Sequence, residues 1–161
     1  MKSDKFIRDE LVFQLTKGNA HMTFKDIVAK FPASHYNDVF PNGRYSFWFV
    51  LEHIRRVQAD ILNFIVNPKY KELEFPKDYW PGEKEKATKK EWDKTIKEFL
   101  KDRNTLKKLI ENPKTDIFKK VPWGSGQTFM REILVVADHN SYELGEFAIM
   151  RQVMGVWGKY H

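Results

Sequence analysis

The sequence predicts an all-α fold: a four-helix bundle with long crossover connections and one extra short helix, formed as a single domain over residues 1–161. Three long segments carry apolar residues at the three- and four-residue spacing of a helix, and no convincing strand pair occurs. Two proline-containing stretches separate these segments, as expected of connections that cross the end of a bundle. With 161 residues, 42% of them apolar, the chain suits one globular domain.

The chain begins with a predicted helix over residues 3–17, capped by Ser3 or Asp4 and ended by Gly18. The residues expected to form its apolar side are Phe6, Leu11, Phe13 and Leu15. A shorter helix is predicted over residues 23–31. Thr23, with Asp26 three residues later, is typical of a helix start, and Pro32 is expected to end it.

Two long helices follow, over residues 45–66 and 88–112. The first has apolar residues one heptad apart, at Val50, Val57 and Phe64, and ends at Asn67-Pro68. The second buries an apolar side and presents its lysines to solvent. Its expected inward residues are Trp92, Ile96, Phe99, Leu100, Leu106, Leu109 and Ile110. Residues 69–82 and 113–126 are the predicted connections.

The last helix, predicted over residues 127–157, has the clearest pattern. Its inward stripe is Phe129, Ile133, Val136, Asn140, Glu143, Phe147, Met150 and Met154. Glu143 is unexpected there, because an unpartnered carboxylate is costly to bury. His139 lies one turn earlier, where its side chain shares a face with Glu143.

This pair, together with His53 at the edge of the apolar stripe of the helix over residues 45–66, predicts a metal site formed by His53, His139 and Glu143. Two histidines and a carboxylate leave coordination positions open, as in catalytic zinc and non-haem iron sites. Residues expected to line the pocket or support the ligands are Asn140, Asp60, Trp48 and Phe49. A second interpretation stays open: His139 and Glu143 form a structural hydrogen-bonded pair in a non-catalytic bundle, and His53 is exposed.

Composition excludes several classes of function. The chain has no cysteine, which rules out disulfides, thiolate metal ligands and a cysteine nucleophile. No apolar run approaches the ~18 residues of a membrane span, and the N-terminus lacks a signal-type segment, so a soluble cytoplasmic protein is expected. Residues 83–120 contribute +5 of the net charge of +6, and their lysines alternate with acidic residues. Such a mixed face argues against specific nucleic-acid binding.

Two segments resemble known helices of one family. Residues 45–62 (YSFWFVLEHIRRVQADIL) resemble the second helix of the DinB-like superfamily (damage-inducible, YfiT-type), and residues 126–146 (GQTFMREILVVADHNSYELGE) resemble its last core helix. The connection with Tyr79-Trp80-Pro81 and the helix with Trp92 are also similar. The resemblance therefore covers most of the chain.

The resemblance implies a four-helix bundle that binds a divalent metal, usually through three histidines. The first two correspond to His53 and His139, whereas the third position is Glu143, a departure from the family pattern. Zinc or nickel is expected, with iron or manganese as alternatives. The resemblance further implies a small-molecule substrate, a low-molecular-weight thiol such as bacillithiol or mycothiol, a transferase reaction (or hydrolase or isomerase), and a homodimer.

Overall fold

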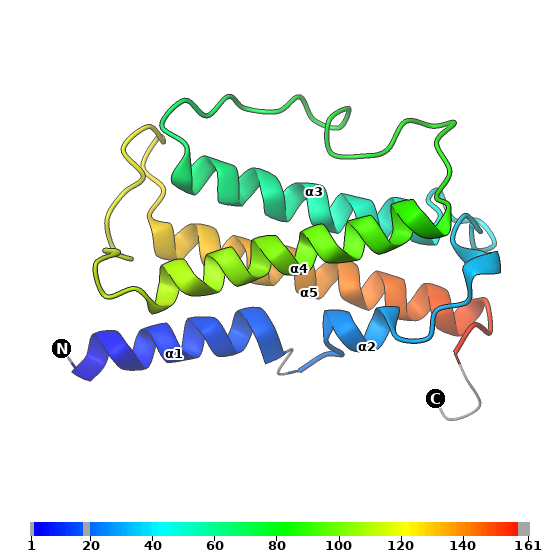
Figure 1. Ribbon diagram of the computed structural model, residues 1–161, viewed down its shortest axis with the longest axis horizontal. Helices are drawn as coiled ribbons and strands as arrows, with labels where there is room; N and C mark the ends of the chain where they lie inside the picture. The colour runs from blue at the N-terminus through cyan, green and yellow to red at the C-terminus, as the bar shows by residue number, and fades with distance from the viewer. Residues whose placement is uncertain (1, 18–19, 158–161) are drawn as a thin grey trace.

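The computed structural model describes residues 2–17 and 20–157, which form an all-α structure (Figure 1). Its helices are α1 (Lys2–Lys17), α2 (Phe24–Val28), α3 (Phe47–Val66), α4 (Lys89–Glu111) and α5 (Phe129–Val153), with a 3-10 turn at Ala33–His35. The described part of the chain contains no β-strand, only two isolated bridges. None of its helices is both long and apolar enough to cross a membrane.

The starts of four helices follow from side-chain caps. Thr23 and Thr88 accept hydrogen bonds from backbone N–H groups of the first turns of α2 and α4, and both form capping boxes. Ser46 and Thr128 cap α3 and α5 in the same way. The Thr23–Asp26 prediction is confirmed, but α2 ends at Val28, well before Pro32. The chain leaves the helix there, and Lys30 takes a positive φ of 50°.

The first helix differs from the sequence prediction. Because α1 begins at Lys2, positions 3 and 4 lie inside the helix and not at its N-cap, and Asp4 forms an ion pair with Arg8. Phe6 and Phe13 are 65% and 44% exposed, so the prediction that they face the core is wrong. They lie one heptad apart on the face opposite the buried Leu11 and Leu15. The predicted helix end at Gly18 lies outside the described residues.

The long helices lie side by side, with α3 packed against both α4 and α5, and α1 against α4 and α5. Figure 1 shows that α3 and α5 run in opposite directions, whereas α3 and α4 run in the same direction. The connection between α3 and α4 therefore returns along the length of the molecule (Figure 1). It contacts α3 through Arg56, whose guanidinium donates to the backbone oxygens of Asp78 and Trp80.

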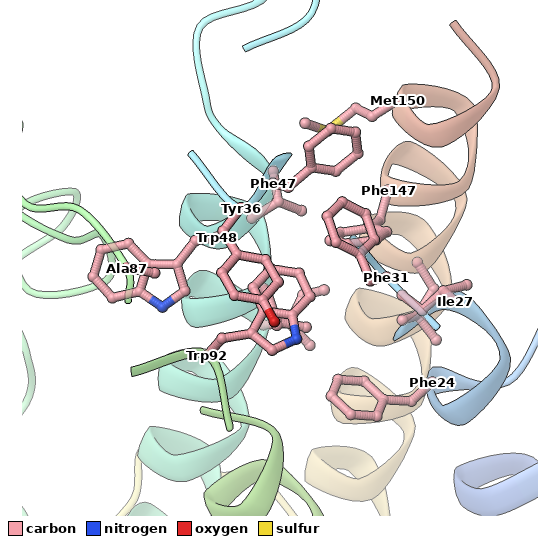
Figure 2. Packing of buried hydrophobic residues seen from close by; sticks show 14 of the residues in the cluster. Phe24, Ile27, Phe31, Tyr36, Phe47, Trp48, Ala87, Trp92, Phe147 and Met150 are labelled. Carbon is pink, nitrogen blue, oxygen red and sulfur yellow. The ribbon is translucent and has the colours of Figure 1, made fainter. Parts of the chain in front are cut away.

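The core consists of two apolar clusters separated by polar residues. One cluster joins α2, the start of α3 and α4, and the end of α5, and it is rich in aromatic side chains such as Phe31, Phe47 and Trp92 (Figure 2). The other joins α1 to the opposite halves of α3, α4 and α5. Between them lie Gln58 on α3 and Asn140 on α5, both buried. The candidate site lies at this level of the α3–α5 interface.

Candidate metal centre

The structure brings His53, His139 and Glu143 together. Their potential ligand atoms, His53 Nε2, His139 Nε2 and Glu143 Oε1, all lie within 4.8 Å of one another. The two Nε2 atoms are 3.2 Å apart, and each is 3.8 Å from Glu143 Oε1. Ligand atoms about 2.1 Å from one tetrahedral ion are roughly 3.4 Å apart. The observed separations therefore fit three corners of a coordination sphere. Within the described chain, this is the one such group of three side chains.

His53 is oriented by two contacts from the connection between α3 and α4. Its Nδ1 lies 2.9 Å from the backbone oxygen of Tyr79. Because a carbonyl oxygen only accepts hydrogen bonds, Nδ1 carries the proton, and Nε2 presents a lone pair to the centre. The ring also stacks on Trp80, with centroids 3.9 Å apart and planes 2° from parallel. Burial lowers the pKa of His53, which favours this neutral form.

His139 is the most accessible of the three side chains. It is 23% exposed, compared with 7% for His53 and 9% for Glu143, so the centre is most open to solvent at this side chain. Burial, with a smaller effect of His53, lowers the pKa of His139 to about 4. Its Nδ1 is buried without a hydrogen-bond partner among the described residues. In the absence of an ion, His139 can donate from Nε2 to His53 Nε2.

Glu143 is a buried carboxylate without compensation. Burial, and to a smaller degree the neighbouring Glu146, raises the pKa of Glu143 to about 7. Its Oε2 atom has no hydrogen-bond partner in the described structure. The distance of 3.8 Å to His139 is too long for the expected hydrogen bond between them. A bound cation would supply the missing compensation and favour the ionised form. The donor set therefore fits a divalent metal ion.

The predicted supporting residues have different surroundings. Asp60 accepts a hydrogen bond of 2.7 Å from the Tyr79 hydroxyl, so it supports the loop that orients His53. Asn140 donates to Gln58 Oε1 at 3.3 Å and lies in the polar layer between the two apolar clusters. Trp48 is a core residue whose Nε1 donates to Thr95 at 3.3 Å, and Phe49 packs against Trp48.

Tyr79, Trp80 and Glu146 contribute to the centre but are not among the site residues predicted from the sequence. Tyr79 and Trp80 lie in the connection, and no local pattern indicates that they contact His53. Glu146 had a detectable signal, because it follows His139 by seven residues and therefore shares its side of α5. Burial raises its pKa.

Comparison of this chain with family models, with curated proteins and with solved structures finds no match. The geometry of the centre therefore carries the functional argument.

Proposed function

We propose that this protein is a divalent-metal-dependent enzyme acting on small molecules, a transferase that uses a low-molecular-weight thiol, with a DinB-like four-helix bundle as its fold. The observation that carries the proposal is the convergence of His53 Nε2, His139 Nε2 and Glu143 Oε1 within 4.8 Å of one another. The resemblance of residues 45–62 and 126–146 to DinB-like helices supports it. The small-molecule substrate, the cytoplasmic location and the homodimer expected from the sequence belong to the same proposal.

In this proposal His53, His139 and Glu143 hold the ion, with zinc or nickel expected and iron or manganese as alternatives. When bound, such an ion lowers the pKa of a thiol or water in its open positions. The protein's own residues prepare the centre. The Tyr79 carbonyl and the Trp80 ring fix the tautomer and the plane of His53. Burial keeps both histidines neutral and able to coordinate.

One observation favours a second candidate, a non-catalytic bundle. The two histidines lie 3.2 Å apart, a distance at which His139 can donate a hydrogen bond to His53 without any ion. In this alternative the hydrogen bond between the two histidines is purely structural. The pair therefore differs from the one expected from the sequence, which joined His139 to Glu143. The unpartnered Glu143 Oε2 is unexplained by it.

Metal analysis and thermal melts distinguish the two candidates. Protein purified without a metal-affinity tag should retain close to one divalent ion per chain after dialysis, and His139→Ala should lose it. A chelator should lower the melting temperature of the wild type, because an ion that binds only the folded state stabilises it. Glu143→His should keep or tighten the binding, whereas Glu143→Leu should lose the metal and retain its fold.

The non-catalytic candidate predicts a different result. A chelator would then leave the melting temperatures of the wild type and of Glu143→His unchanged. Glu143→His would be less stable than the wild type, because it buries a third imidazole without an ion. Full metal occupancy in His139→Ala would show that the assignment of ligands is wrong.

A further inference from the structure

A second site lies along the same α3–α5 interface, two helical turns from the metal centre. Asp60 follows His53 by seven residues on α3, and Glu132 precedes His139 by seven on the antiparallel α5. Seven helical residues span about 10 Å. Both acidic residues line a cavity of about 540 Å³, a volume typical of small-molecule sites. The end of α3, the start of α5 and the two long connections enclose it.

Glu132 is buried in the wall of this cavity, and the neighbouring Arg131 offsets the effect of this burial on its carboxylate only in part. It is only 8% exposed, and no described residue forms a hydrogen bond or ion pair with its carboxylate. Burial raises its pKa, since the charged form loses hydration there. Glutamate is seldom buried to this degree unless it is paired. The missing partner is the first indication that the cavity accommodates a positively charged ligand.

Asp60 adds a second negative charge on the opposite helix. Its Oδ2 accepts hydrogen bonds from the hydroxyls of Tyr79, at 2.7 Å, and Tyr70, at 3.2 Å. Its Oδ1 has no partner in the described structure. Burial and Asp60 raise the pKa of Tyr70 to about 12, so this phenol stays protonated and donates. Two neutral hydroxyls orient the carboxylate but leave its charge in place, and no lysine or arginine lines the cavity.

The other walls are aromatic, formed by Phe64, Tyr70, Tyr79 and Trp123. The Trp123 indole is held over the end of α3 by a 2.6 Å hydrogen bond to the backbone oxygen of Phe64. Aromatic faces attract organic cations as well as apolar groups. Close packing at this wall requires glycine at position 124, where a Cβ atom would come within 2.8 Å of the Phe64 ring. The combination suits a ligand with both a charged and an apolar part.

We propose that this cavity binds an organic cation, a primary ammonium group carried on an apolar or aromatic body, with Glu132 and Asp60 as its counter-charges. An inorganic ion is a poorer fit, because these carboxylates and the nearby Glu72 do not bring three ligand atoms together as the metal centre does. The site is separate from the metal centre, so the proposal stands independently of the proposed function.

The test uses three probes of similar shape and different charge: phenethylamine, 2-phenylethanol and phenylacetate. Calorimetry on chelator-treated protein at about pH 8 should show the amine binding at least about tenfold more tightly than the alcohol. Phenylacetate should not bind measurably. Trp123 fluorescence should change on titration with the amine, because its ring lines the cavity. Magnesium and calcium salts at equal ionic strength should not displace the amine specifically.

Variants connect the preference to the named residues. Glu132→Gln keeps the side-chain shape and should weaken amine binding toward the level of the alcohol, because Asp60 alone then supplies the counter-charge. Asp138→Asn, which removes an exposed carboxylate from the same helix, is the matched control and should bind like the wild type. Ser125→Lys changes an exposed residue at the cavity wall and should block the amine with its own ammonium group. This last variant keeps the test decisive if Glu132→Gln fails to fold.

Three results would overturn the proposal. The first is equal affinity for amine and alcohol, which would indicate an apolar cavity without charge selection. The second is an amine preference that neither Glu132→Gln nor Ser125→Lys reduces. The third is competition by a divalent metal salt that ionic strength alone does not reproduce, which would indicate an inorganic cation site.

Discussion

The Nδ1 atom of His53 lies 2.9 Å from the backbone oxygen of Tyr79, which assigns the proton to Nδ1 and directs the Nε2 lone pair toward His139 and Glu143. A residue of the connection, 26 positions away in the chain, thereby determines how a helix residue can act. The same connection stacks Trp80 on the His53 ring. The candidate centre therefore depends on a segment without regular secondary structure.

The first prediction concerns Trp80. Replacing it with alanine removes the stacked partner that holds the plane of His53, so we expect zinc affinity to fall about tenfold. Trp80→Phe retains a ring and should restore most of the affinity. Trp123→Ala removes an indole near Phe64, at the other end of α3, and serves as the control. Competition with a chelating dye measures all three, and unchanged affinity in Trp80→Ala would contradict the prediction.

The second prediction concerns pH. In metal-free protein the pKa of Glu143 is about 7, raised from 4.5, the ordinary value that it regains on unfolding. The folded state then holds a proton that the unfolded chain releases between these values, so Glu143 lowers stability progressively as pH rises through that window. Glu143→Gln removes this contribution. We expect its advantage over wild type in thermal melts with chelator to be small near pH 5 and to grow toward pH 8.

Asp138→Asn alters an exposed carboxylate on the same helix and should follow the wild type over the whole range. With saturating metal the wild type should be more stable than Glu143→Gln above neutral pH. The ion then compensates the charge of Glu143, whereas the glutamine variant offers it no carboxylate to bind. A pH-independent difference between Glu143→Gln and wild type would contradict this prediction.

The third prediction concerns the buried amide pair. Gln58 is fully buried, donates to the backbone oxygen of Phe99 at 2.9 Å and accepts from Asn140 at 3.3 Å. Gln58→Leu leaves the Asn140 amide without an acceptor and should cost about 1–3 kcal/mol. The double variant Gln58→Leu/Asn140→Leu should recover part of that loss, since both partners become apolar. Urea unfolding of the wild type, Gln58→Leu, Asn140→Leu and the double variant gives the coupling energy between the two amides. Strict additivity of the two single losses would show that the amides act independently.

The fourth prediction concerns charge. Three lysines of α4 form ion pairs with acidic residues on the same helix, at Lys89–Asp93, Lys94–Glu98 and Lys107–Glu111. Because these pairs neutralise each other's field, duplex DNA should bind only weakly and lose affinity steeply with salt. Fluorescence anisotropy with two unrelated duplexes tests this. Tight binding at physiological salt, with a preference for one duplex, would contradict the prediction.

Local patterns in the sequence predict where the helices lie and which residues are the metal candidates. Capping residues such as Thr23 and Thr88 and the stripe on α5 are local signals, since a side-chain cap and a helical period involve only neighbouring residues. For the same reason Asn140 and Glu143 were recognisable as polar residues facing a core, with His139 beside them.

The alignment of the helices and the residues that lie between them depend on contacts between distant parts of the chain. Gln58 and Arg8 are polar residues that the sequence alone would place in solvent. Gln58 is nevertheless fully buried, and Arg8 donates to the backbone oxygens of Ile110 and Thr115, both at 2.7 Å. The backbone oxygens to which they donate lie 41 to 107 residues away in the chain. The contacts of Trp80 with His53 and of Tyr79 with Asp60 depend on the path of the connection, which has no periodicity to read. A pattern within one helix specifies a face, whereas the register between helices results from packing all of them at once.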